Sequence, residues 1–134
     1  MSLIVAFTGA GISKASGIPT FEERTDLRDV LTRTNWDTNP KIVWDAIKEM
    51  EILATQARPN PAHLALANYQ IPIVTQNIDG LHQRAGSREV IELHGNLQRA
   101  QCTNCGKVVS MVTLPTLTKC VCGSYFKPEV VLYE

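Results

Sequence analysis

Three short, mostly apolar stretches, at residues 3–7, 71–74 and 90–93, are the most regular hydrophobic feature of the chain. Stretches of four or five such residues are typical of strands buried in a parallel sheet. The first stretch is apolar throughout, which predicts a central strand covered on both faces. Helical patterns separate the first two stretches and follow the second, and this alternation predicts an α/β fold with a parallel, Rossmann-like sheet.

The longest helical pattern begins at Pro40, a first helical position where the missing amide of proline costs nothing. Apolar residues then recur every three or four positions, which predicts one buried stripe made of Val43, Ile47, Met50, Ala54 and Ala57, broadened by Trp44 and Ile52. The charged residues on the same helix are expected to face water, namely Lys48, Glu49 and Glu51.

Shorter helices are predicted at residues 12–16 and 81–85, because a glycine follows each of them and ends it. Asn60 and Pro61 begin a further helix, in which His63 is expected to make a structural hydrogen bond. Residues 17–38 have no clear period and are interpreted as a loop with short helical pieces that covers a site.

Length and composition describe one globular domain. The chain has 134 residues, of which 44% are hydrophobic and 19% charged. Its 13 basic and 13 acidic residues cancel, which argues against a nucleic-acid or membrane partner. Residues 98–127 differ, since they hold four basic residues and no acidic one. No stretch approaches the length of a membrane span, and the apolar start of the chain has no positive flank, so we expect a cytoplasmic protein without a signal peptide.

Polar side chains follow two of the predicted strands at their carboxyl ends. Thr75, Gln76, Asn77 and Asp79 follow one strand, and His94 follows the other. Ligands of open α/β sheets bind beyond the carboxyl ends of the strands, so these residues are candidates for a site. The alternative is that they are ordinary turn and capping residues, which are common in any loop. Histidine exchanges a proton readily near neutral pH, so His94 is the candidate general base.

The first strand is followed by a glycine-rich turn, with Gly9 and Gly11 ahead of a short helix. Glycines at such a turn let bare backbone amides approach a pyrophosphate. The third glycine of the dinucleotide fingerprint is absent, because Lys14 stands in its place. A tight turn without a ligand remains the alternative. Together with the polar strand ends, the turn predicts a single nucleotide-sized hollow.

Four cysteines form two close pairs, and fourteen residues separate the pairs. In a chain without an export signal they are more readily metal ligands than disulfides. We therefore predict a structural zinc site with four thiolate ligands, although the second pair has the tighter CxC spacing: Cys102, Cys105, Cys120 and Cys122. Residues 98–127 would be a zinc ribbon inserted in a Rossmann-like domain of residues 1–97 and 128–134, and residues 130–133 would return to the buried sheet.

Several longer motifs occur together in the chain, namely GAGISKASGIPTF at residues 9–21, ARPNPAH at 57–63, TQNIDGLHQRAG at 75–86, ELHG at 92–95, the two cysteine pairs and KPEVVLYE at 127–134. In these motifs the chain resembles the sirtuin family of NAD-dependent protein-lysine deacylases. These motifs occur in the order of the family and cover nearly all of the chain. The glycine and QNID motifs are specific in combination, far more so than the glycine spacing alone.

The resemblance implies that NAD is consumed as a co-substrate. The acyl oxygen of a modified lysine would attack the ribose carbon as nicotinamide leaves, and His94 would then deprotonate a ribose hydroxyl. Free lysine and an acylated ADP-ribose would result, with Asn77 and Asp79 as further catalytic residues. The residues implied to contact NAD are Gly9, Ala10, Gly11, Ser13, Phe21, Gln76, Asn77, Ile78, Asp79 and His94.

The sequence departs from the family in three respects, two of which are single residues. Glu22 stands where the family has an arginine, whose role is uncovered unless Arg24 or Arg28 replaces it. Lys127 stands where arginine is common, and the sequence stops where the family continues with further strands. The alternatives are therefore an ADP-ribosyltransferase or NAD hydrolase with the same pocket, or a catalytically incomplete NAD- and zinc-binding module. An incomplete sheet would expose an edge and apolar faces, so self-association is also expected.

Overall fold

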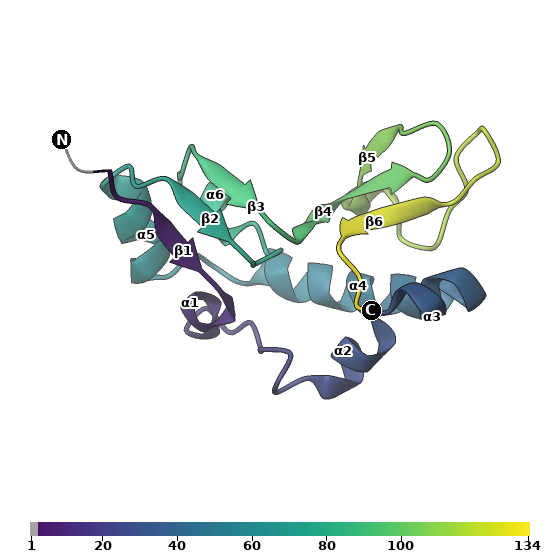
Figure 1. Cartoon of the computed structure of the whole chain (residues 1–134), viewed down its shortest axis with the longest axis horizontal. Helices are drawn as coiled ribbons and strands as arrows, with labels where there is room; N and C mark the ends of the chain where they lie inside the picture. Colours follow the sequence, from purple (N-terminus) through teal and green to yellow (C-terminus); the bar gives the residue numbers. More distant parts are fainter. Residues whose placement is uncertain (1–2) are drawn as a thin grey trace.

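The computed structural model describes residues 3–134, which form two three-stranded sheets linked by a long helix (Figure 1). Helix α4 lies below the second of these sheets in the view of Figure 1 and packs against it. The elements follow one another as β1 (Ala6–Thr8), α1 (Ala10–Lys14), α2 (Thr25–Val30), α3 (Arg33–Thr38), α4 (Pro40–Gln56), α5 (Pro61–Asn68), β2 (Ile73–Thr75), α6 (Leu81–Arg84), β3 (Val90–Glu92), β4 (Gly95–Cys102), β5 (Val108–Ser110), η1 (Met111–Thr113) and β6 (Phe126–Val130).

The first sheet is parallel, with the strand order β1-β2-β3. This confirms the predicted α/β fold with a parallel sheet. Thr8, Thr75 and Glu92 are aligned across the three strands, so all three strands end at the same edge of the sheet. The glycine turn, the polar loop after β2 and His94 all follow this edge.

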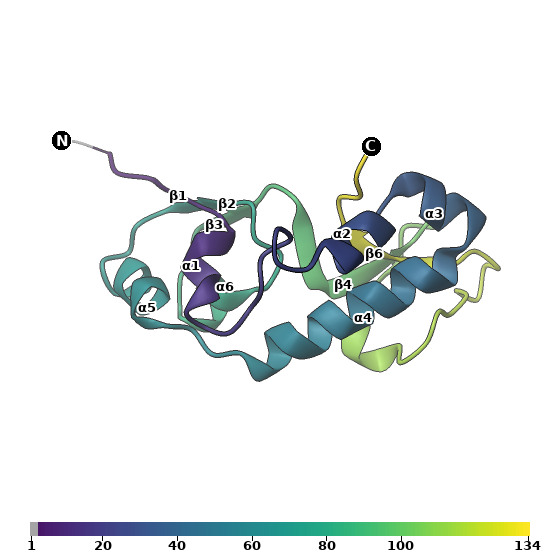
Figure 2. The same cartoon turned by 90° about the horizontal axis from the view of Figure 1, so that it is seen from below.

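The prediction that the first strand is central and covered on both faces is wrong. β2 occupies the centre and β1 the edge, and Figure 2 shows α1, α5 and α6 on one side of the sheet. The other side carries apolar residues in one row, with Phe7 65% exposed, Ile91 61% exposed and Val74 between them. An apolar strand is buried on both faces only if two layers cover it, and residues 3–134 supply one layer.

Helix α4 begins at Pro40 as predicted and buries the expected stripe, including Val43, Trp44 and Ile47. The expectation that Lys48 and Glu51 face water is wrong, since the Lys48 side chain is only 17% exposed, and so is the burial expected of Ile52. Glu51 is only 4% exposed, because its carboxylate pairs with the Lys48 ammonium at 3.3 Å, and that ammonium also donates to the carbonyl of Met111 at 3.1 Å. Ile52, expected to broaden the buried stripe, is half exposed.

The second sheet is antiparallel, with the order β5-β4-β6, and it packs against α4. Leu97 of β4, Met111 of η1 and Phe126 of β6 join Trp44 and Ile47 of α4 in one buried cluster. Such a cluster across two elements provides most of the hydrophobic stabilisation of a small domain.

The prediction that residues 130–133 return to the parallel sheet is wrong. Val130 ends β6 in the antiparallel sheet, and Tyr133 instead forms an isolated bridge with Thr32. The chain therefore runs back past the loop of residues 17–38, which contains α2 and α3 as its predicted short helical pieces. Among the helices of residues 3–134, none combines the length and the hydrophobicity that a membrane span needs.

Candidate functional site

A cavity of about 330 Å³ lies beyond the common edge of the three parallel strands. Its other walls come from the loop after α1, from α4, and from residues 130–133. A cavity of this volume is large enough to take part of a nucleotide. Eight of the ten residues that were predicted to contact NAD line it: Ala10, Ser13, Phe21, Gln76, Asn77, Ile78, Asp79 and His94.

The two glycines of the turn are outside the cavity wall, and they differ from each other. Gly9 is joined to the site through its carbonyl oxygen, which accepts a hydrogen bond of 2.8 Å from Asn77 Nδ2. A Cβ at Gly9 would lie 3.5 Å from Gln76 Oε1, whereas a Cβ at Gly11 would meet nothing within 4 Å. A side chain at either glycine would therefore meet no clash, and Gly9 takes part in the site through its carbonyl oxygen.

A buried hydrogen-bond network ties α1 to the loop after β2. The Ser13 hydroxyl donates to Asp79 Oδ2 at 2.6 Å, and Asn77 Nδ2 donates to Ser13 Oγ at 3.3 Å. The second oxygen of Asp79 accepts from the backbone amide of Leu81 at 3.0 Å, which anchors the start of α6. Ser13 and Asp79 are both buried, so this network fixes the cavity wall that they form.

His63 makes the structural hydrogen bonds that the sequence predicted. Its Nδ1 accepts from the backbone amide of Asn60 at 3.1 Å and completes a capping box at the start of α5. Its Nε2 therefore carries the proton and lies 3.4 Å from Ser13 Oγ, whose own hydrogen goes to Asp79. Burial lowers the pKa of His63 against the opposing attraction of Asp79, so the ring is neutral at physiological pH.

His94 is exposed at the turn between β3 and β4. Its backbone carbonyl accepts from the amide of Val131 at 2.9 Å, and this bond joins the strand end to the last wall of the cavity. Within residues 3–134 the imidazole has no hydrogen-bond partner, so it is free to meet a ligand in the cavity that it lines.

Arg24 and Arg28 were the two candidates to replace the arginine that is absent at Glu22. Arg24 lines the cavity and Arg28 does not. The guanidinium of Arg24 donates to Asp26 at 3.0 Å and to Glu49 at 2.8 Å, and these bonds raise its pKa. The positive charge at this wall is therefore already shared between two carboxylates.

The cavity residues of the segment 130–133 were missed by the sequence interpretation because that segment was assigned to a buried strand. Leu132 and Tyr133 line the cavity, and the Tyr133 ring meets Phe21 edge to face at 6.0 Å between centroids. Phe21 is thereby half-buried as well as facing the cavity. Only tertiary contact between residues 17–38 and the end of the chain brings these rings together.

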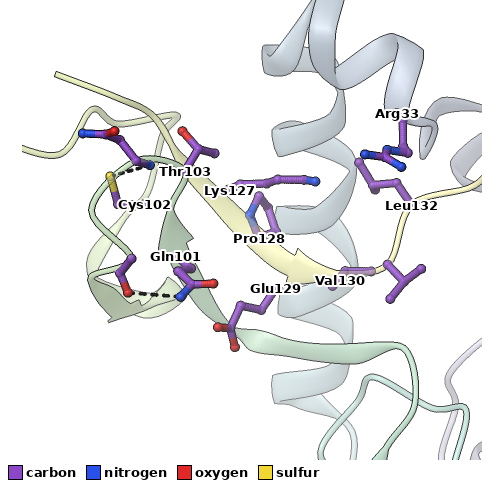
Figure 3. Close-up of a pocket in the computed structure, with 12 residues that line it drawn as sticks. Arg33, Gln101, Cys102, Thr103, Lys127, Pro128, Glu129, Val130 and Leu132 are labelled. Carbon is purple, nitrogen blue, oxygen red and sulfur yellow. Dashed lines mark hydrogen bonds between the residues drawn. The ribbon is translucent and has the colours of Figure 1, made fainter.

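A second, larger cavity of about 630 Å³ lies on the flank of the ribbon (Figure 3). Arg33 and Lys127 line it, and neither makes an ion pair within the part of the chain that the structure describes. No predicted site residue except the metal ligand Cys102 reaches this cavity. The smaller cavity is therefore the candidate site, because the strand ends converge on it.

The four cysteines form a compact cluster whose sulfur atoms all lie within 4.8 Å of one another. The Sγ atoms of Cys102 and Cys122 are 3.3 Å apart, and those of Cys105 and Cys120 are 3.7 Å apart. Four sulfurs at ~2.3 Å around one tetrahedral zinc ion would be roughly 3.8 Å apart. The cluster therefore fits a structural zinc ion.

The thiols of the cluster differ in their pKa values. The backbone amide of Ser124, with Cys102 and Asn104, lowers the pKa of Cys122 to about 6, which favours its thiolate. Cys105 behaves oppositely: although the amide of Lys107 lowers its pKa, contacts with Cys102 and Cys120 raise it to about 11. Four adjacent thiolates repel one another unless a metal ion balances their charge.

The sequence model of the Sir2 family matches residues 9–134. The chain belongs to the Sir2 family. Among curated relatives it is 43% identical to an NAD-dependent protein deacylase of Aeropyrum pernix and 41% identical to one of Thermococcus kodakarensis. Each alignment covers 96% of this chain and 58% of the relative, so the chain spans less than three-fifths of the length of these proteins.

Two solved Sir2 structures also match this chain, which covers less than three-fifths of each of them. A Sir2 homologue in complex with NAD has a TM-score of 0.88 and 37% identity, over 98% of this chain and 57% of that chain. Sir2Tm bound to a propionylated peptide has a TM-score of 0.84 and 37% identity, over 98% of this chain and 59% of that chain. The fold described above is thus that of the corresponding part of a Sir2 protein.

Proposed function

We propose that this protein takes part in NAD-dependent removal of acyl groups from lysine side chains of other proteins. The observation that carries the proposal is the convergence of three separate segments of a Sir2-family chain on one cavity at the strand ends. The names of its relatives support the reaction class, and the chain spans less than three-fifths of their length. The proposal therefore concerns the activity of the whole enzyme to which these residues correspond.

In the proposed site, NAD would occupy the cavity and be consumed. The acyl oxygen of the lysine substrate would attack the ribose carbon as nicotinamide departs. His94 would then remove a proton from a ribose hydroxyl, because its imidazole lines the cavity and has no hydrogen-bond partner within residues 3–134. The residues proposed to hold NAD are Gly9, Ala10, Gly11 and Ser13 near the phosphates and adjoining ribose, Gln76, Asn77, Ile78 and Asp79 near the nicotinamide ribose and carboxamide, and Phe21 over the reactive face.

Two structural assignments belong to the same proposal. Residues 98–127 form the zinc-ribbon insert and residues 1–97 with 128–134 form the NAD-binding portion; the antiparallel sheet, which spans residues 95–130, supports a separate ribbon. We also propose a cytoplasmic location, because a cluster of reduced thiols that fits a metal ion suits a reducing compartment.

The test is mass spectrometry of an acetyl-lysine peptide incubated with NAD and the protein, as the 134-residue chain and as any longer form from the same gene. Acylated ADP-ribose and free lysine are the expected products, and ADP-ribose alone or a modified protein would point to NAD hydrolysis or ADP-ribosyl transfer instead. His94→Ala is expected to lose ~10²-fold or more of the rate, the usual scale for a general base. Lys107→Ala, on the exposed flank of the ribbon, is the matched control.

A second candidate is an incomplete module that binds NAD and zinc without turnover. The uncovered apolar face around Phe7 and Ile91 favours it for the isolated chain, since such a face ordinarily meets another layer or another molecule. Calorimetry that finds NAD binding by a chain without deacylase activity would support this candidate. Sedimentation that finds a monomer at all concentrations would argue against the expected self-association.

A further inference from the structure

His82 lies in α6, behind the wall of the candidate site, and is 1% exposed. It is absent from the cavity lining, yet its Nε2 is 2.8 Å from the hydroxyl of Thr8, the last residue of β1 before Gly9. Thr8 is also tied to the end of β2: its hydroxyl donates to Thr75 Oγ1 at 2.8 Å, and its carbonyl accepts from the Gln76 amide at 3.0 Å. His82 therefore joins the point where two strand ends meet the glycine turn.

The directions of these hydrogen bonds determine which nitrogen of His82 carries the proton. The Thr8 hydroxyl has one hydrogen and gives it to Thr75, so it accepts a hydrogen bond from His82 Nε2. His82 Nδ1 is then an acceptor, and it is buried without a partner among the described residues. Burial lowers the pKa of His82, the nearby His63 lowers it further, and Asp79 opposes both, so the ring stays neutral.

Few other hydrogen bonds fix the end of β1, the strand that His82 contacts at Thr8. Within residues 3–134, β1 is three residues long, lies at the edge of the sheet and pairs with β2 alone. From the cavity side, Asn77 fixes the turn through the Gly9 carbonyl. From the opposite side the corresponding contact is the one between His82 and Thr8. A short edge strand with few ladder bonds depends more strongly on each side-chain bond at its end.

We propose that His82 is a positioning residue that holds Thr8 and so sets the place of the glycine turn, residues 9–11, in the NAD site. This inference rests on the proposed function, because the turn is where the phosphates would bind. His82 itself would not touch NAD. Its contribution would be to keep the backbone amides of the turn in the orientation that binding requires, at no ordering cost when NAD arrives.

The test compares two amide substitutions in the zinc-loaded 134-residue chain. In His82→Gln the side-chain nitrogen reaches about as far as Nε2 and can still donate to Thr8, whereas the shorter side chain of His82→Asn cannot. One hydrogen bond with a net value of ~0.5–1.5 kcal/mol corresponds to roughly 2–12-fold in affinity. His82→Asn is therefore expected to weaken NAD binding by about 2–12-fold in calorimetry, and His82→Gln by less than about twofold. Thr8→Val should weaken binding less in the His82→Asn background than in the wild type, because one of the two hydrogen bonds of the Thr8 hydroxyl is already lost there.

A second readout separates positioning from loss of stability and does not need NAD. Amide hydrogen exchange at residues 9–11 should be faster in His82→Asn and close to wild type in His82→Gln. Val43→Ala, in the buried cluster of α4 away from the cavity, should lower the melting temperature without changing exchange at the turn or the affinity of the folded chain.

Each outcome has one meaning. Equal weakening by both substitutions, or wild-type affinity and exchange in His82→Asn, would overturn the positioning role. If the wild-type chain binds no NAD, these 134 residues do not form the proposed NAD site by themselves, and the exchange data still decide the role of His82. Faster exchange at residues 9–11 in His82→Asn alone would then support it, and unchanged exchange would refute it.

Discussion

Replacing one zinc ligand is expected to unfold the ribbon and open the candidate site. Cys102 and Cys120 are buried, whereas Cys105 and Cys122 are exposed. The cluster holds together the two segments of the ribbon that carry these two pairs of cysteines. β5 has only three residues, and the described structure holds no disulfide. Structural zinc sites contribute an apparent ~10–16 kcal/mol, which equals or exceeds the whole stability of a typical domain, ~5–15 kcal/mol.

The magnitude for Cys122→Ser follows from this comparison. Shared equally among four ligands, this value gives ~2.5–4 kcal/mol for one ligand, which is the smallest loss expected, and a domain of this size loses roughly 3–5 °C of melting temperature per kcal/mol. The melting temperature should therefore fall by at least about 8 °C. Because Leu97 of β4 and Val130 of β6, the strands that lead into and out of the ribbon, also line the cavity, NAD binding should be lost together with the metal.

The assay combines elemental analysis with thermal unfolding, under reducing conditions and with and without a chelator. One zinc ion per wild-type chain is expected, with little or none in Cys122→Ser. Thr103→Ala, an exposed position beside the cluster, is the matched control and should change neither the zinc content nor the melting temperature. A wild-type chain that is folded without zinc, or that keeps its melting temperature in the chelator, would refute the assignment of a structural metal.

Two further predictions concern stability. Gly95 has φ +91°, and a Cβ there would lie 1.9 Å from the Glu129 carbonyl oxygen. In urea unfolding, Gly95→Ala should therefore cost more stability than the ~1–2 kcal/mol of the left-handed conformation alone. A Cβ at Gly11 meets nothing within 4 Å, so Gly11→Ala should be neutral or stabilising in the same measurement. Burial lowers the pKa values of His63 and His82 in the folded chain, so their neutral forms contribute stability above the unfolded pKa near ~6.5 that is lost as pH falls. The free energy of unfolding should drop between pH 7 and pH 5 by at most about 1.4 kcal/mol per pH unit for each ring, and an equally steep drop in a His63→Gln, His82→Gln double variant would contradict this cause.

Local signals explain why much of the secondary structure could be predicted. Pro40 and the stripe that starts at Val43 predict α4, since helix initiation and amphipathic spacing are encoded within a few turns. Asn60 with Pro61 predicts the start of α5 in the same way, and the structure adds His63 as the partner that completes the cap. The cysteine spacing predicted a compact ligand set, which the sulfur distances bear out.

Predictions that depended on the partners of a segment were the ones that went wrong. An apolar strand reads the same at the centre and at the edge of a sheet, so the exposure of Phe7 was hidden. Glu51 reads as a surface residue until the packing of α4 on the ribbon places Lys48 and Glu51 in one buried pair. Arg24 and Tyr133 join the candidate site only because the loop after α1 and the end of the chain fold over the same cavity.

What the sequence determined by itself was the alternation of strands and helices, the polar strand ends, the thiolate cluster and the membership of a family, because each depends on residues near one another in the chain or on motifs in order. The tertiary structure alone decided which of these residues share a cavity and how each proton is held. Thr8 and His82, separated by 74 positions, illustrate the reason. Strand register and helix packing set the distance between two such side chains, and neither is written in the residues beside them.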